Sequence, residues 1–168
     1  MRRMKATALL LTLLWALPAA AQSASDNDTT TEPPKPRFQV INGDTVKFGP
    51  HQLVRLFGID APDTGQACDD DAWWPAPLAK RALERFIGGR PVTCRQVDND
   101  QKSNPPLAQC FAGDDDLQAK MVSAGWAWAF ARYSDRYAPE EREAKGAKLG
   151  VHGHRCLPPW EWRAQQRR

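Results

Sequence analysis

The sequence predicts an α+β fold, a small five-stranded β-barrel with three helices packed against it. Three short strand-like runs separated by turn residues come first, followed by a helical repeat, two more strand-like runs and two helix-like segments. The resulting order β-β-β-α-β-β-α-α fits a small closed barrel with helices on its outside. A five-stranded barrel of this kind is an OB-fold, which presents one face to an extended ligand.

The first three strands are expected to form a meander, because only short turns separate them. The turns carry Asn42-Gly43-Asp44 and Gly49-Pro50, which are strong turn signals. They divide three strand-like runs at 38–41, 45–48 and 53–57. Residues 59–77 contain acids, Gly and Pro without a periodic pattern, so we predict a long ordered loop there.

The first helix is predicted by apolar residues that repeat at helical spacing and stop at Gly88-Gly89. These apolar residues are Leu78, Ala82, Leu83, Phe86 and Ile87. Two more strands are expected at 92–97 and 107–112, on either side of a polar stretch. Together with the meander, they give the five strands of the barrel.

Two more helices are expected in the C-terminal half of the chain. Asp115 or Asp116 can cap a helix whose apolar residues begin at Leu117. The last helix is expected to begin at Pro139, with acids at its positive end, and to stop at Gly150. These segments complete the set of three helices.

Composition divides the chain into four parts. Residues 1–21 have the features of a secretory signal peptide: a basic start, an apolar run at 8–17 and small residues before the expected cleavage site. The apolar run is shorter than the ~20 residues of a membrane-spanning helix, so we expect a periplasmic or secreted protein without membrane insertion. Residues 22–36 are expected to be a disordered leader, residues 37–153 the folded domain and residues 154–168 a C-terminal tail.

The positive net charge of the chain lies in the signal peptide. The sequence has 23 Lys and Arg against 20 Asp and Glu, and Arg2, Arg3 and Lys5 account for the excess. The exported part is therefore about neutral, which excludes a strongly basic protein that binds polyanions through net charge alone. Its length fits one domain, and we expect a monomer.

Four cysteines follow the signal peptide, and an even number in an exported chain favours two disulfides, with three possible pairings. Cys94 and Cys110 fall in the middle of the fourth and fifth strands, so they can form a cross-strand bridge if these strands pair. Cys68 and Cys156 would then tie the long loop to the tail. Free buried cysteines and a zinc site are the alternatives, although no pair has the C-x2-C spacing typical of zinc.

Three acids and one arginine lie at turns or strand positions near the start of the domain. Asp44, Asp60 and Asp63 can converge as hard oxygen ligands, which suits Ca²⁺. Arg55 lies in mid-strand, where a charge is unusual unless it faces a ligand. A guanidinium beside a metal can hold a phosphate through two parallel hydrogen bonds. The alternative interpretation is a solvated acidic turn.

Several short motifs occur together in the domain. In chain order they are Asn-Gly-Asp-Thr-Val at 42–46, Arg-Leu-Phe-Gly-Ile-Asp-Ala-Pro-Asp at 55–63, Asp-Leu-Gln-Ala-Lys-Met-Val at 116–122, Gly-Trp-Ala at 125–127, Tyr133 and Lys-Leu-Gly-Val at 148–151. With these motifs the domain resembles the staphylococcal nuclease (thermonuclease) family. The resemblance implies an OB barrel with three helices, a calcium ion, and cleavage of phosphodiester bonds in DNA or RNA.

The resemblance also implies roles for individual residues. Asp44 and Asp60 match carboxylates that bind calcium, and Ala61 matches a ligand that binds through its backbone carbonyl. Arg55 matches the first of two arginines that hold the phosphate, and Tyr133 matches a tyrosine of the nucleotide pocket. The expected partner is nucleic acid, as single-stranded DNA or RNA.

Two positions depart from the family pattern. Asp63 stands where the family has a glutamate as general base, and its side chain is one methylene shorter. Pro105 stands where the family has its second phosphate-binding arginine, and Lys102 is the nearest cation that could bind substrate there. We therefore expect a nuclease of reduced activity, with Asp63 as base and Arg55 at the phosphate. The alternative is a catalytically silent nuclease-like module that serves in binding or structure in the cell envelope.

Overall fold

The computed structural model describes residues 38–97 and 104–167. The predictions made for the signal peptide, for the leader and for Lys102 concern residues outside these ranges. The main sheet has six strands, with β1-β2-β3-β6-β5 as its order and β7 paired to β6. Its strands are β1 (Phe38–Val40), β2 (Thr45–Phe48), β3 (Gln52–Leu56), β5 (Val92–Gln96), β6 (Leu107–Ala112) and β7 (Asp115–Asp116).

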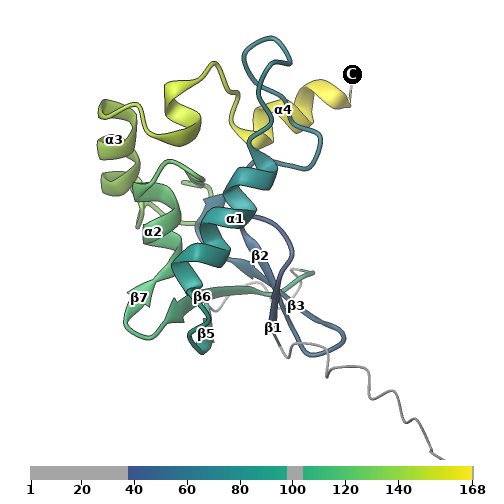
Figure 1. The fold of residues 1–168 in the computed structure, drawn as a ribbon, viewed down its shortest axis with the longest axis vertical. Coiled ribbons are helices and arrows are strands. Elements are labelled where there is room, and N and C mark those ends of the chain that lie inside the picture. Colours follow the sequence, from purple (N-terminus) through teal and green to yellow (C-terminus); the bar gives the residue numbers. More distant parts are fainter. Residues whose placement is uncertain (1–37, 98–103, 168) are drawn as a thin grey trace, which may run out of the picture. The chain divides into compact units, whose positions relative to one another are not determined.

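The pairing of these strands gives an OB-fold-like arrangement. β1, β2 and β3 pair antiparallel as the predicted meander, and β5 pairs antiparallel with β6. The link between the two groups is a parallel pair, β3 with β6, in which Arg55 lies opposite Leu107. The five strands predicted from the sequence are confirmed, and together with the helices they make the predicted α+β barrel-type fold (Figure 1).

The long loop predicted at 59–77 is only partly a loop. It begins with β4 (Ile59–Asp60), which pairs antiparallel with β8 (Trp128–Ala129) in a separate two-stranded sheet. A strand of two residues is too short to show the alternation of apolar and polar residues that predicts a strand. It forms only because a distant segment pairs with it. This pairing brings Asp60 opposite Trp128.

Four α-helices lie in the described part of the chain, where the sequence predicted three. They are α1 (Ala76–Ile87), α2 (Leu117–Ser123), α3 (Ala138–Gly146) and α4 (Pro159–Gln166), and the short 3-10 helix η1 (Gly150–Gly153) lies between the last two. The additional helix, α4, falls in the segment that was expected to be a tail. It buries only Pro159, so it lacks the apolar repeat on which the sequence prediction relied.

The predicted stop of α1 and the predicted N-terminal cap of α2 are confirmed. Gly88 ends α1 in the left-handed region, with φ of 57°, which glycine adopts at low cost. Asp116 is the residue that caps α2, because its carboxylate accepts the N–H groups of Gln118 and Ala119 at 3.0 and 3.1 Å. Asp115 instead pairs with Arg90 and Lys120 on the surface.

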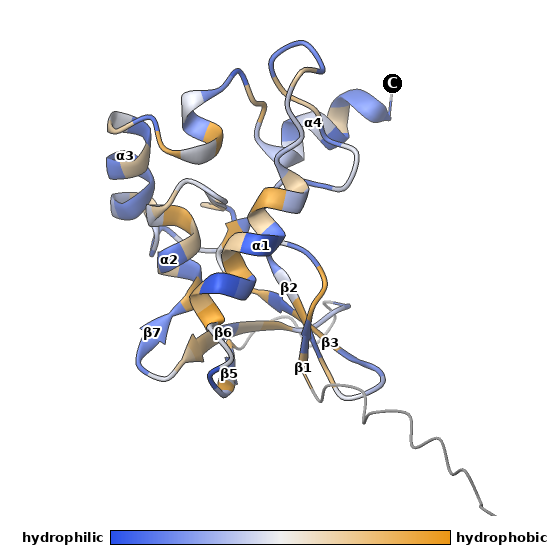
Figure 2. Ribbon diagram, viewed as in Figure 1, coloured by the Kyte–Doolittle hydropathy of each residue, from blue (hydrophilic) through white to orange (hydrophobic). Residues whose placement is uncertain are grey.

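The hydrophobic core lies between the sheet and the first two helices. Its fully buried side chains include Val46 and Leu56 of the sheet, Leu83 of α1 and Met121 of α2. Figure 2 shows the same division, with the hydrophobic colour gathered on these strands and helices and the hydrophilic colour prevailing on α3 and α4. No helix within residues 38–97 and 104–167 combines the length and apolar character needed to cross a membrane.

The last predicted helix ends earlier than expected. The sequence placed its end at Gly150, but α3 ends at Gly146, and Lys148 then adopts a φ of 53° that turns the chain away. Gly150 instead meets Gly125, whose backbone oxygen accepts the Val151 N–H at 2.8 Å. A Cβ atom on Gly125 would lie 2.1 Å from the Leu149 oxygen, so this crossing of two chain segments requires glycine.

We expect Gly125→Ala to lower the free energy of unfolding by about 2–4 kcal/mol, because the residue has a φ of +71° and no space for a side chain. Urea denaturation of the oxidised protein measures the effect. Gly146→Ala is the matched control: a Cβ there meets nothing within 4 Å, and in the helix it should raise stability by about 0.5–1 kcal/mol. Equal stability of the two variants would contradict the close crossing.

Candidate active site

Asp44 lies at the end of the first turn, directly before β2, with its carboxylate buried. The side chain of Asn42 accepts the Asp44 N–H at 3.0 Å, which fixes the turn. One carboxylate oxygen accepts the hydroxyl of Thr45 at 2.9 Å, and the other accepts the N–H of Ala61 at 3.0 Å. These contacts orient a carboxylate that is only 2% exposed.

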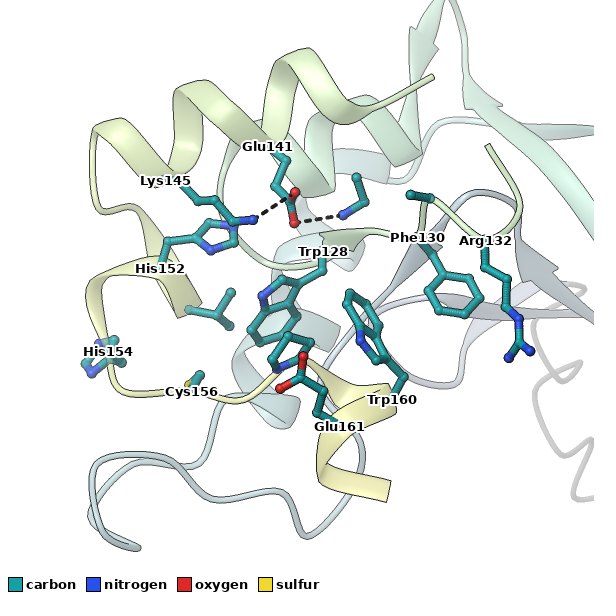
Figure 3. A pocket seen from close by; sticks show the side chains of 14 residues that line it. Trp128, Phe130, Arg132, Glu141, Lys145, His152, His154, Cys156, Trp160 and Glu161 are labelled. Atoms are coloured by element: carbon teal, nitrogen blue, oxygen red, sulfur yellow. Dashed lines mark hydrogen bonds and ion pairs between the residues drawn. The ribbon is translucent and has the colours of Figure 1, made fainter. Parts of the chain in front are cut away.

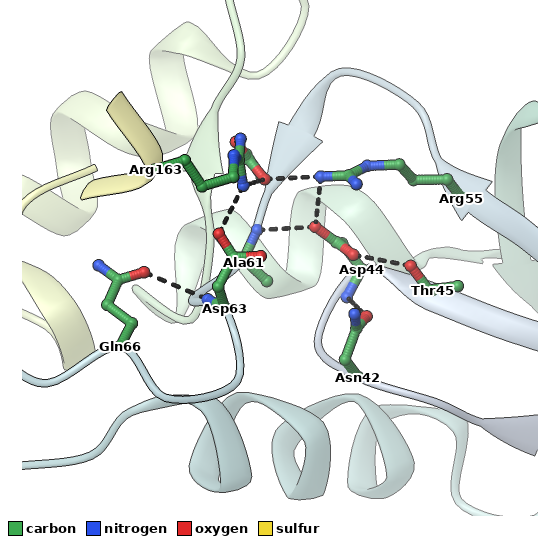
Figure 4. A network of polar contacts seen from close by, with 9 residues as sticks. Asn42, Asp44, Thr45, Arg55, Ala61, Asp63, Gln66 and Arg163 are labelled. Carbon is green, nitrogen blue, oxygen red and sulfur yellow. Dashed lines mark hydrogen bonds and ion pairs between the residues drawn. The ribbon is translucent and has the colours of Figure 1, made fainter. Parts of the chain in front are cut away.

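Arg55 of β3 joins two acids that come from different parts of the chain. It lies opposite Thr45 in the β2–β3 pair, so its side chain is next to Asp44. Its Nη2 donates to Asp44 Oδ2 at 3.1 Å and to Asp60 Oδ1 at 2.6 Å (Figure 4). One oxygen of each acid therefore faces the same point, which a single cationic nitrogen occupies.

Asp60 is almost completely buried, with 1% of its surface exposed. Burial raises the pKa of the Asp60 carboxyl, since it disfavours the charged form, and the nearby Asp44 charge raises it further. A hydrogen bond from Arg163 and the charges of both arginines oppose this shift. A buried carboxylate of this kind needs a cation as its partner, because water cannot reach it.

The second cation at Asp60 is Arg163, which the sequence analysis did not single out. It comes from α4, and its Nη2 lies 2.5 Å from Asp60 Oδ2 while its Nη1 lies 2.6 Å from Asp63 Oδ2. Burial alone would lower the pKa of Arg163, but hydrogen bonds and charges from Asp60 and Asp63 outweigh it and raise that pKa above its ordinary value. Pro159 and Glu161, in the first turn of α4, are the sequence signals that could have revealed this helix.

Several contacts hold the segment before α4 against the loop that follows Asp63. Gln66 is buried; its side chain accepts the Asp63 N–H at 3.2 Å and donates to the Leu157 oxygen at 2.7 Å. Two residues further on, Cys68 forms a disulfide with Cys156. The second disulfide joins Cys94 and Cys110, which face each other in the β5–β6 pair. These are the two pairs expected from the strand positions.

A cavity of about 420 Å³ opens above the acids and both arginines. Phe130 and Tyr133 form an aromatic wall, with ring centroids 5.0 Å apart, and Tyr133 is half exposed. Pro105 also lines the cavity and brings no charge to it. The described lining residues are Arg55, Ile59, Asp60, Asp63, Asn104, Pro105, Leu107, Phe130, Tyr133 and Arg163.

The donor set suits a hard cation that keeps part of its hydration shell. Asp44 and Asp60 offer carboxylate oxygens to one point, and Ala61, which follows Asp60 in the chain, donates its N–H to Asp44. In the described residues no group of three or more His, Cys, Asp or Glu side chains is arranged around one metal position. Calcium takes six to eight oxygen ligands, including backbone carbonyls and water, so two carboxylates would supply only part of its ligands.

The profile of the family described as "Staphylococcal nuclease homologue" matches residues 53–152. The chain belongs to the staphylococcal nuclease family. It is 28% identical to the protein ParB of Escherichia coli, over 96% of this chain and 91% of that protein. The micrococcal nuclease of Shigella flexneri is 31% identical, over 74% of this chain and 77% of that protein. A probable staphylococcal-like nuclease of Oryza sativa subsp. japonica is 30% identical over 68% of this chain, which spans 22% of that longer protein.

The structure of this staphylococcal nuclease homologue brings most of the predicted site residues together. Asp44, Arg55, Asp60 and Ala61 are joined by hydrogen bonds. Asp63 and Tyr133 line the same cavity as Arg55. The family match ends at residue 152, whereas Arg163 lies beyond it. Arg163 also lies outside the motifs, at 42–46 to 148–151, that carry the resemblance to the family.

A second cavity, of about 890 Å³, shares Phe130 with the first. Trp128, Phe130 and Trp160 gather at its centre, and the rings of Phe130 and Trp160 are 5.2 Å apart (Figure 3). His152 of η1 lies at its edge, where its ring meets Trp128 edge-on and its Nε2 is buried without a partner among the described residues. The surroundings of His152 therefore disfavour its protonated, charged form.

We expect His152 to make stability pH-dependent. Burial lowers the pKa of His152 below its usual 6.5; Lys145 lowers it further, and Glu141 opposes the shift. Because the unfolded chain takes up this proton at higher pH than the folded chain, the free energy of unfolding should fall as the pH drops below about 6.5. Urea denaturation at pH 7.5 and pH 5 measures the decrease in the free energy of unfolding between these pH values. This decrease should be smaller for His152→Asn than for the wild type. An equal loss would contradict this role.

Proposed function

We propose that this protein is an exported, calcium-dependent nuclease that hydrolyses phosphodiester bonds in single-stranded DNA or RNA. The observation that carries the proposal is the convergence of two buried carboxylates, Asp44 and Asp60, on one nitrogen of Arg55. Asp60 and Arg55 line an open cavity. Membership of the staphylococcal nuclease family supports the reaction type, and the name of the Shigella flexneri relative supports nucleic acid as the substrate.

Calcium would be held by Asp44, Asp60 and the backbone carbonyl of Ala61, with water or substrate oxygens as its remaining ligands. When bound, the ion would neutralise charge on the phosphate and position a water molecule. The arrangement of the donors supports this assignment, because Arg55 Nη2 already links an oxygen of Asp44 to an oxygen of Asp60. Arg55 can turn from the acids toward the cavity, since its side chain is 33% exposed.

Arg55, Asp63 and Tyr133 would act on the substrate directly. Arg55 would donate hydrogen bonds to the non-bridging phosphate oxygens and stabilise the charge that develops on them. Asp63 is partly exposed in the cavity and would take the proton from the attacking water. Tyr133, half exposed at the rim, would stack against a base of the unpaired strand.

Export and a monomeric state belong to the same proposal. Export is supported by the features of residues 1–21 and by two disulfides, which persist in oxidising compartments. The exported chain has about zero net charge, so it would attract nucleic acid at its site and not over its whole surface. The low turnover expected from the shorter base at Asp63 stays a prediction, which the cleavage assay below measures.

The test is cleavage of single-stranded DNA by the full chain, exported during expression and purified with its disulfides oxidised. We expect cleavage with calcium and none with chelator. Asp60→Asn keeps the size of the side chain but weakens the calcium site, so it should lower the rate by about 100-fold or more. Activity that persists in this variant would come from a contaminating nuclease and would count against the proposal.

Calcium binding without cleavage would favour the alternative function, a nuclease-like binding module. Isothermal titration of the same preparation with calcium, and then with single-stranded DNA, separates these two functions. A protein that binds neither calcium nor DNA would contradict both.

We expect Asp63→Asn to lower the cleavage rate by about 10²–10⁴-fold, because the amide cannot accept the proton from water. Asp63→Glu restores a carboxylate and should retain activity, since the cavity gives room for one more methylene. Rates on single-stranded DNA at saturating calcium measure both variants. If Asp63→Asn cleaves as fast as the wild type, another residue is the base.

A further inference from the structure

We infer that Arg163 is a second phosphate-binding catalytic residue of this site, supplied by the C-terminal helix; the inference rests on the proposed function. Arg163 lies outside the motifs, at 42–46 to 148–151, from which the roles above were assigned.

Arg55 and Arg163 approach the same acid from opposite elements. Arg55 of β3 contacts Oδ1 of Asp60, and Arg163 of α4 contacts Oδ2 at 2.5 Å. Asp60 is buried beneath them, whereas the side chains of the two arginines are 33% and 29% exposed. Both arginines line the cavity of about 420 Å³. A ligand that enters this cavity therefore meets two guanidiniums before it meets the acid.

The chemistry of Arg163 suits a phosphodiester. A guanidinium carries five N–H donors in a planar fork, and the ion pairs of Arg163 engage its Nη1 and Nη2. Phosphate oxygens match this fork, and two parallel hydrogen bonds are the preferred arrangement. A guanidinium stays charged at every working pH. Pro105, on another part of the cavity lining, offers no such donor.

The net charge of the three acids and two arginines at the site bears on how strongly a phosphate is attracted. Asp44, Asp60 and Asp63 against Arg55 and Arg163 give a formal charge of −1. A divalent cation changes this to +1, which a phosphodiester with its single negative charge neutralises. Without Arg163 the loaded cluster would be neutral and would attract the phosphate less strongly. Arg163 thus supplies the positive charge that remains for the substrate.

The position of α4 is fixed by contacts that do not involve Arg163. α4 buries only Pro159, so its apolar packing is small. The preceding segment is held by the Cys68–Cys156 disulfide and by the hydrogen bond from Gln66 to Leu157. Asp69 adds a third link, accepting the N–H of Arg155 at 2.8 Å. Replacing Arg163 should therefore leave the helix in place.

The test compares Arg163→Gln with Arg167→Gln, which removes the same charge from an exposed position at the end of α4. We expect Arg163→Gln to lower kcat for single-stranded DNA by about 100-fold or more, while its calcium affinity is equal to or higher than that of the wild type, because a competing cation is gone. Arg163→Lys keeps the charge but not the fork, and should have intermediate activity. Arg167→Gln should stay within about threefold of the wild type, as expected for a screened surface charge.

A binding measurement makes the inference independent of cleavage. A short single-stranded oligonucleotide with phosphorothioate linkages keeps the negative charge, and its affinity is measured by titration with calcium present. Arg163→Gln should weaken this affinity by about tenfold or more relative to Arg167→Gln. If the wild type binds the oligonucleotide but does not cleave DNA, the proposed function fails. The weaker affinity of Arg163→Gln would still support Arg163 as a phosphate ligand. If the wild type does not bind the oligonucleotide, the inference is overturned as well.

Three other results would overturn the inference. Wild-type activity and affinity in Arg163→Gln would show that Arg163 does not touch the substrate. Faster cleavage would show that α4 shields the site. Loss of calcium binding together with a lower Tm, in both Arg163→Gln and Arg163→Lys, would show that the residue only supports the structure.

Discussion

The site depends on one electrostatic constraint, the burial of two carboxylates side by side. Buried acids are stable only when hydrogen bonds and cations compensate the loss of water. Asp44 receives the Thr45 hydroxyl and the Ala61 N–H, and both acids share Arg55 Nη2. This arrangement requires the register in which Arg55 lies opposite Thr45. A slip by one residue would turn Arg55 to the other face of the sheet and leave the acids without their cation.

The same constraint explains the role of the end of the chain. Asp60 and Asp63 carry more negative charge than Arg55 can balance, and Arg163 supplies the missing cation. The helix that carries it has little apolar surface to bury, so a disulfide and polar contacts fix its position. A disulfide and polar contacts thus hold α4 in position, whereas apolar packing holds α1 and α2. The site thus includes a residue, Arg163, that none of the family motifs of this chain contains.

Electrostatic attraction in this protein is local. The excess of Lys and Arg over Asp and Glu in the whole sequence is accounted for by residues 1–21, so the remainder is about neutral. Attraction for an anion must then come from a few oriented groups in a cavity and not from the surface as a whole. The two arginines above Asp60, next to the ring of Tyr133, concentrate such groups at one place. Such a concentration of charged groups favours an anion at one place over attraction to the surface as a whole.

Resemblance to the staphylococcal nuclease family grouped Asp44, Arg55 and Asp60. Sequence patterns by themselves determined the five strands and the helices α1 and α2. These features depend on periodic patterns and on turns between neighbouring strands, which act over a few residues. Tertiary structure alone decided where α3 ends, because Gly150 meets Gly125 from another segment, and it joined β4 to β8. It also placed Arg163 at acids 100 and 103 residues earlier in the chain. No local pattern encodes a contact of that separation, since it exists only after the barrel has formed and the disulfide has brought the end of the chain back to it.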